Sequence, residues 1–92
     1  KKVQFMYTGD FKTIEFEFFG DSIEAVLDRL PTAEIIEKTD KCYKVRAEIY
    51  GEGVKRWILS QKEFLKVLKP QDYVDEIKNT IQKMYELYNV KN

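Results

Sequence analysis

Apolar and polar residues alternate along two stretches of the chain, each about the length of a β-strand. In Thr13–Phe19 the apolar side chains take every second position, and Glu15 and Glu17 stand between them. The same period of two runs through Cys42–Tyr50, and the polar turn Thr39-Asp40-Lys41 joins this stretch to Ala33–Lys38. Because successive side chains of a strand point to opposite faces, we predict a half-buried strand followed by a hairpin.

A helical period follows the first strand. After Gly20 the positions i, i+3, i+4 and i+7 are apolar, and they are occupied by Ile23, Val26, Leu27 and Leu30. Asp21, followed three residues later by Glu24, resembles a capping box, which predicts where this helix starts. Pro31 predicts where it ends, because proline cannot continue a helix.

The next stretch combines a second helix with a fourth strand. Val54, Trp57 and Ile58 share one helical face, so this face must be covered, and we expect Trp57 to anchor the core. Phe64–Leu68 is a short apolar strand. Pro70 ends it, because proline has no N–H for the ladder, and proline also fits the first turn of a following helix.

The final helix carries a narrow apolar seam. Its apolar residues recur at alternating spacings of three and four, and they are Val74, Ile77, Ile81, Met84 and Tyr88. Since a two-layer fold is already complete at Leu68, the seam is not needed to cover the helical face of the sheet. The other face is largely charged, and burying unpaired charges is costly. We therefore expect the seam to be an oligomerisation surface that docks on a partner subunit or on a further domain.

The order of these elements predicts an α+β fold. Strand, helix, strand, strand, helix and strand are the pattern of the ferredoxin-like βαββαβ two-layer sandwich, here with an extra C-terminal helix. We assign residues 11–92 to this domain. We assign residues 1–10, which include a strand-like alternation from Val3 to Tyr7, to a linker or arm from a preceding domain. A chain of 92 residues accommodates one such domain.

The composition excludes several kinds of active site. The chain has 16 basic and 16 acidic residues, so no net charge attracts it to nucleic acid or to an anionic membrane. It has no histidine, which excludes Ser-His-Asp and Cys-His systems and histidine-containing zinc sites. The single cysteine, Cys42, is expected to be a structural thiol in a reducing cytoplasm. We expect no metal, no cofactor and no membrane-spanning segment.

Glu15 and Glu17 are the only pair that suggests catalysis, since two carboxylates can act as acid and base. Alternating charge on the solvent face of a strand is far more common, however. Acyl-phosphate hydrolases with a ferredoxin-like fold need an arginine in the loop after the first strand, and that loop is Phe19-Gly20-Asp21 here. We expect no catalytic residues and no enzymatic activity.

Basic residues are the remaining candidates for a binding site. RNA-recognition sheets stack bases on exposed aromatic residues, whereas the exposed face expected here carries Glu15 and Glu17, which would repel phosphate. Arg46 with Lys55-Arg56 could add a small basic patch to a nucleic-acid site shared with another domain. Arg29, Arg46 and Arg56 are also the candidate ligand-binding residues, provided that they converge on an apolar pocket.

Five short motifs occur in an order that is typical of one family. They are Met6-Tyr7-Thr8-Gly9, Asp28-Arg29-Leu30-Pro31, Trp57-Ile58-Leu59-Ser60, Val67-Leu68-Lys69-Pro70 and a final helix that ends at Tyr88. In order and spacing they resemble the C-terminal extension, called WCX, of WYL-domain transcriptional regulators. The resemblance covers roughly residues 5–88. Many members of that family have an aromatic-glycine turn where this chain has Gln61-Lys62.

The resemblance implies a ferredoxin-like fold and a non-enzymatic regulatory and oligomerisation domain in a cytoplasmic, bacterial regulator. It also implies an upstream WYL domain and a helix-turn-helix in the same protein, so that only the full-length dimer would bind DNA. The alternative is a domain that binds a small-molecule or nucleotide effector. An apolar pocket with convergent arginines would favour this alternative, and a self-complementary apolar surface would favour oligomerisation.

Overall fold

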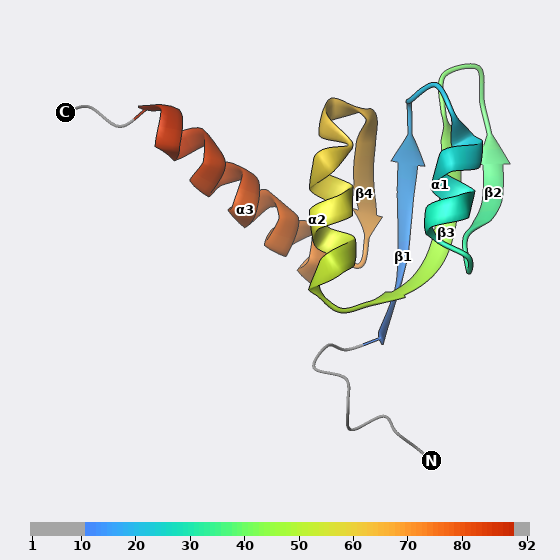
Figure 1. The fold of residues 1–92 in the computed structure, drawn as a ribbon, viewed down its shortest axis with the longest axis horizontal. Coiled ribbons are helices and arrows are strands. Elements are labelled where there is room, and N and C mark those ends of the chain that lie inside the picture. Colours follow the sequence, from blue (N-terminus) through green and yellow to red (C-terminus); the bar gives the residue numbers. More distant parts are fainter. Residues whose placement is uncertain (1–10, 90–92) are drawn as a thin grey trace, which may run out of the picture.

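The computed structural model describes residues 11–89, which form the predicted order of strands and helices (Figure 1). The elements are β1 (Phe11–Phe18), α1 (Ile23–Arg29), β2 (Glu34–Lys38), β3 (Tyr43–Tyr50), α2 (Glu52–Ser60), a 3-10 turn η2 (Lys62–Phe64), β4 (Leu65–Lys69) and α3 (Gln71–Asn89). The expected arm, residues 1–10, and its strand-like alternation lie outside the described residues.

The four strands form one antiparallel sheet in the order β2-β3-β1-β4. Helices α1 and α2 lie on the same face of this sheet, which leaves its other face open (Figure 1). The fold is therefore α+β, and it is compatible with a ferredoxin-like arrangement followed by an additional helix.

The alternation predicted for the first strand is confirmed. In β1, Ile14 and Phe16 are completely buried and Phe18 is nearly so, because they face the helices. Glu15 and Glu17 lie on the open face and are half-buried between the neighbouring strands. β1 pairs with β3 on one side and with β4 on the other, so its apolar residues lie at the centre of the core.

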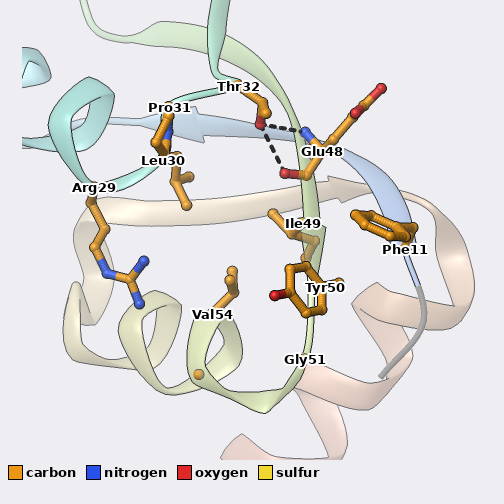
Figure 2. Close-up of a pocket in the computed structure, with 11 residues that line it drawn as sticks. Phe11, Arg29, Leu30, Pro31, Thr32, Glu48, Ile49, Tyr50, Gly51 and Val54 are labelled. Atoms are coloured by element: carbon orange, nitrogen blue, oxygen red, sulfur yellow. Dashed lines mark hydrogen bonds between the residues drawn. The ribbon is translucent and has the colours of Figure 1, made fainter. Parts of the chain in front are cut away.

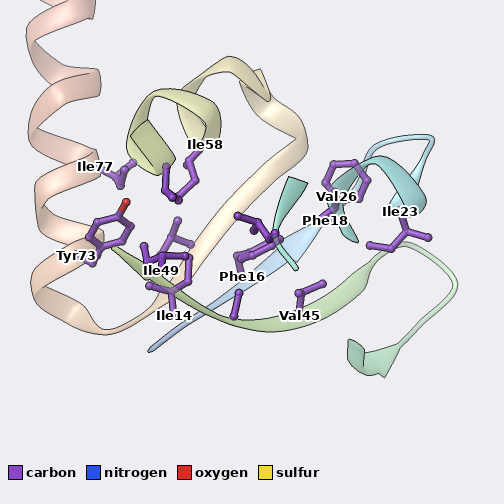
Figure 3. Close-up of a cluster of buried hydrophobic side chains, with 14 residues drawn as sticks. Ile14, Phe16, Phe18, Ile23, Val26, Val45, Ile49, Ile58, Tyr73 and Ile77 are labelled. Carbon is purple, nitrogen blue, oxygen red and sulfur yellow. The ribbon is translucent and has the colours of Figure 1, made fainter. Parts of the chain in front are cut away.

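The core contains side chains of β1, β3, β4 and all three helices (Figure 3). Its most deeply buried large members are Phe16, Ile14, Val26 and Val45. None of the five residues of β2 is fully buried, because β2 is an edge strand that pairs only with β3 and its register shifts between Ile35 and Glu37. The hairpin is thus present, but its first strand contributes little to the core.

The start of α1 differs from the prediction by one residue. The N-cap is Ser22, not Asp21: its backbone is extended, and its hydroxyl oxygen accepts a hydrogen bond from the Ala25 N–H at 3.2 Å. Gly20 precedes it where the chain passes the ring of Phe18, and a Cβ at Gly20 would overlap that ring. The close approach therefore requires glycine at this position.

The segment from α2 to β4 also differs from the prediction. The strand is Leu65–Lys69, one residue later than expected, because the 3-10 turn takes up Phe64. In this turn Lys62 has a φ of 62°, the left-handed region that glycine favours. Trp57 packs against the edge of the core and is half-buried. It is thus a partly buried residue at the border of the core, whereas we expected it to anchor the core.

Helix α3 completes the core, so the expectation that the fold ends at Leu68 was wrong. Tyr73 and Ile77, in its first two turns, are 4% and 8% exposed and lie beside Ile14, Ile49 and Ile58 (Figure 3). The pattern along α3 could not reveal this, because the same face continues unchanged into the part of the helix that is not covered.

Candidate functional site

A cleft of about 520 Å³ lies between the end of α1, the end of β3 and the start of α2 (Figure 2). Its volume is within the range of about 300 to 1,000 Å³ that is common for small-molecule sites. Apolar residues form much of its wall, and they include Leu30, Pro31, Ile49 and Val54. Phe11 and Tyr50 line it from the ends of β1 and β3, with ring centroids 5.0 Å apart.

Arg29 is the basic residue of this cleft. It stands in the last turn of α1, and its guanidinium group faces the cleft from the side opposite the Tyr50 hydroxyl (Figure 2). The guanidinium carbon lies 6.0 Å from the ring centroid of Trp57, a distance compatible with a cation–π contact. Among residues 11–89, no carboxylate forms an ion pair with Arg29.

The loop between α1 and β2 is fastened to β3 at the edge of the cleft. The Thr32 hydroxyl donates a hydrogen bond to the Glu48 carbonyl at 2.8 Å and accepts one from the Glu48 N–H at 3.0 Å. The carboxylate of Glu48 points away from the cleft (Figure 2). The edge is therefore held in place by the backbone of Glu48, while its negative charge faces outward.

The first turn of α2 forms another part of the wall. Gly51 is its N-cap, with a φ of 81°, and no described side chain caps this end of the helix. Gly53 and Val54, in the first turn, line the cleft. The wall therefore includes the end of a helix where free N–H groups and the positive end of the helix dipole favour an anion.

The three arginines predicted to bind a ligand do not converge. Arg46 lies on the open face, where its guanidinium group is 3.5 Å from Glu15, and Arg56 is exposed on α2 and does not line the cleft. Only Arg29 lies at the cleft. The sequence pattern could not separate them, because the separation depends on which ends of α1, α2 and β3 meet.

The open face of the sheet carries columns of alternating charge. Glu15 lies between Arg46 and Lys69, at 3.5 and 4.0 Å. The strand register places Glu17 between Lys44 and Lys66. The acidic residues of β1 are thus flanked by basic residues on both sides, which makes this face largely self-neutralised. It does not offer the basic surface that phosphate binding needs.

The predicted seam of α3 is divided between two environments. Ile77 is buried in the core and Val74 is half-buried against it, so neither is available to a partner. Ile81, Met84 and Tyr88 are exposed. The pattern of threes and fours missed Tyr85 and Leu87, which are 63% and 75% exposed. Tyr85 lies on the same apolar side, and Leu87, three residues after Met84, borders it. We call the five exposed residues the distal face: Ile81, Met84, Tyr85, Leu87 and Tyr88.

Among residues 11–89, ion pairs connect only the first half of α3 to the rest of the domain. Lys12 of β1 lies 3.3 Å from Asp72, and Lys55 of α2 lies 3.2 Å from Glu76. Beyond Thr80 every described residue of α3 is exposed, and the helix leaves the body of the domain (Figure 1). The distal face is therefore an apolar surface on a projecting helix end.

Tyr73 is the residue of the described part of the chain whose pKa is clearly shifted by its surroundings. Burial of its phenol, together with the nearby carboxylates of Glu76 and Glu52, raises the pKa of Tyr73 from 10.0 to about 12. Its hydroxyl has no hydrogen-bond partner among the described residues. Tyr73 lies apart from the cleft and supports packing, so we assign it no chemistry.

The described residues limit the kind of site in two further ways. Within residues 11–89, no three potential ligands of the types His, Cys, Asp or Glu are grouped so that they could hold a metal ion. None of the helices in this part of the chain combines the length and the apolar character needed to span a bilayer.

The chain matches no protein-family model, and neither a curated protein nor a solved structure shows significant similarity to it. Its function must therefore be argued from the cleft and from the distal face.

Proposed function

We propose that this chain is a non-enzymatic regulatory domain that self-associates through the distal face of α3. Its fold would be a ferredoxin-like βαββαβ sandwich with a C-terminal helix that serves as the oligomerisation element. We further propose that it is the C-terminal, WCX-like part of a cytoplasmic, WYL-type transcriptional regulator. DNA would then be bound by an upstream helix-turn-helix domain of the full-length protein.

The exposure of the distal face is the observation that carries this proposal. Its five side chains range from 47% to 89% exposed. Together they present on the order of 600 Å² of apolar surface, comparable to the share of about 800 Å² that each partner contributes to a stable interface. Apolar patches of this size on a soluble domain usually mark an interaction site.

A second copy of the chain fits this surface better than a charged partner does. Between Ile81 and Asn89 the helix carries one basic and one acidic residue, Lys83 and Glu86, so two copies would not repel one another. The whole chain is also neutral. A two-fold interface places the same patch against itself, which requires a neutral, self-complementary surface of this kind. Two projecting helix ends can meet in this way without contact between the sheets.

Three observations support the family assignment. The five motifs occur in the order typical of the family, and the sheet order is compatible with the fold that the resemblance implies. In addition, Lys62 adopts a left-handed backbone at the turn where many relatives have glycine. The self-neutralised open face favours a role in regulation over direct contact with nucleic acid.

Sedimentation of matched variants tests the proposal. The wild type is expected to dimerise with rising concentration. Ile81→Glu with Met84→Glu should remain monomeric, while its thermal unfolding in dilute solution stays unchanged. The control, Asn79→Glu with Gln82→Glu, adds the same charges at the same spacing on the polar side of α3, and it should dimerise like the wild type.

Three outcomes would contradict self-association: a wild type that stays monomeric at millimolar concentration, an Ile81/Met84 variant that still dimerises, or a control that dissociates equally. If the wild type is monomeric alone but binds an upstream domain of its own protein, the distal face would be the interface with that domain and not a dimer interface.

A further inference from the structure

We propose that the cleft between α1, β3 and α2 binds a small organic anion, specifically a carboxylate with an apolar or aromatic body. This inference is independent of self-association, because the cleft includes no residue of α3. It rests on three features of the cleft: a cation without an acidic partner, an apolar wall and a volume suited to a small molecule.

The charge of Arg29 is the first feature. Several other basic groups have an acidic partner: Arg46 pairs with Glu15, Lys12 with Asp72 and Lys55 with Glu76. Arg29 forms no such pair among residues 11–89, and Glu48, the acidic residue at the edge, points outward (Figure 2). The cleft therefore presents a positive charge that an anion can neutralise.

The orientation of Arg29 suits a carboxylate. Its guanidinium carbon lies 6.0 Å from the centroid of the Trp57 ring, a cation–π distance that favours this position of the planar group. A guanidinium plane can donate two parallel N–H bonds to the two oxygens of a carboxylate, a geometry that a single halide ion or a neutral amide cannot use. The nearby first turn of α2 adds a favourable dipole, which is secondary to the charge of Arg29.

The apolar wall determines that the part of the ligand beyond its carboxylate should be apolar. Leu30, Ile49 and Val54 lie between Arg29 and the paired rings of Phe11 and Tyr50 (Figure 2). A ligand that reaches from the guanidinium group to these rings would cover apolar surface along its whole length. Inorganic phosphate would use only the charge, and a neutral hydrocarbon would use only the wall. An aryl or alkyl carboxylate uses both.

The test is a titration followed by amide NMR and calorimetry, with 3-phenylpropionate as the probe. It should be run on the Ile81→Glu, Met84→Glu variant, so that the apolar distal face does not bind the probe or complicate the oligomeric state. Saturable shifts are expected at the amides of Leu30, Tyr50 and Gly53. No shifts are expected at Tyr85 or Tyr88.

Charge dependence separates this site from non-specific binding. Arg29→Met retains a long side chain on an exposed position but removes the charge, and it should weaken binding at least tenfold. Arg29→Lys should be intermediate, because a point charge replaces the bidentate donor. The matched control Arg56→Met, which removes an exposed arginine of α2, should leave binding unchanged. The neutral 3-phenylpropionamide should bind at least tenfold more weakly than the acid.

Several results would overturn the proposal. They are shifts confined to residues outside the cleft, equal binding by Arg29→Met and the wild type, or equal binding of the acid and the amide. Effective competition by inorganic phosphate would reduce the site to a general anion site. If only adenosine monophosphate competed with the probe, the ligand would be a nucleotide and not a carboxylate. None of these results would affect the sedimentation test of self-association.

Discussion

The first and second halves of α3 share one apolar side but lie in different surroundings. In Gln71–Thr80 this side is buried by the domain, with Tyr73 4% and Ile77 8% exposed. One turn later, Ile81 is 49% exposed, although it has the same residue type and the same helical position as Ile77. The difference shows that an apolar stripe specifies which side of a helix will be covered and leaves open what covers it.

The length of α3 explains where its buried half ends and its exposed half begins. Each helical residue adds about 1.5 Å, so the nine residues after Thr80 carry the helix about 14 Å beyond its last buried turn. Asp72 and Glu76 fix the first half to β1 and α2, and no described residue of β1 or α2 forms an ion pair with the second half. The first half thus belongs to the fold, while the second half is available to a partner.

The largest expected effect comes from truncating the two matched isoleucines. Ile77→Ala should lower the free energy of unfolding by about 2 to 4 kcal/mol, because it leaves a cavity in the core. Ile81→Ala should change it by less than about 0.5 kcal/mol in dilute solution, because its side chain is half exposed. Urea unfolding at low protein concentration measures both. Equal losses would mean that the distal half is also part of the core.

Alkaline pH should destabilise the domain through Tyr73. Its pKa of about 12 in the folded state is above the ordinary value of 10.0, so the unfolded chain loses this proton first. The protonated Tyr73 phenol therefore contributes to the free energy of unfolding. This contribution is fully present below pH 10 and is lost as the pH rises from 10 towards 12, by up to about 3 kcal/mol.

Urea unfolding between about pH 9 and pH 12 tests this expectation, since the titration window is set by the two pKa values. Tyr73→Phe should remove this part of the pH dependence, whereas Tyr88→Phe, in the exposed half, should retain it. If the two variants had the same pH profile as the wild type, Tyr73 would not be responsible.

Removing the ion pair between α2 and α3 should have a smaller effect on the free energy of unfolding. Lys55 lies 3.2 Å from Glu76 and 3.9 Å from Glu52. Lys55→Met should cost about 0.5 to 1 kcal/mol, and high salt should reduce the difference from the wild type. Lys78→Met removes an exposed lysine of α3 and serves as the control, with no expected change. A salt-independent loss would indicate that the aliphatic part of Lys55, and not its charge, stabilises the helix.

The smallest effect is expected from removing the Tyr73 hydroxyl at neutral pH. This group is buried without a described hydrogen-bond partner, which is unfavourable relative to its hydrated state in the unfolded chain. Tyr73→Phe should therefore be neutral or raise the free energy of unfolding by about 0.5 kcal/mol. A clear loss of stability in a chemical denaturation experiment would show that the hydroxyl has a partner in solution.

Local pattern was sufficient where one short segment determines its own structure. Ile14, Phe16 and Phe18 were assigned to the buried face from their spacing, because the geometry of a strand fixes the direction of alternate side chains. Pro31 and Pro70 likewise marked the limits of helices correctly, since the proline ring restricts the backbone by itself. The composition, with no histidine and no net charge, limited the chemistry in the same direct way.

Features that depend on distant segments were decided only by the tertiary structure. Arg29, Arg46 and Arg56 are equivalent in the sequence, but only Arg29 meets the cleft, because the ends of α1, β3 and α2 come together there. Ile77 and Ile81 are also equivalent by periodicity, and the extent of the surface formed by α2 and the sheet separates them. The sequence determined which faces are apolar and which groups are charged, since these are properties of single segments. The tertiary structure decided which of them remain exposed, since exposure depends on what packs against each face.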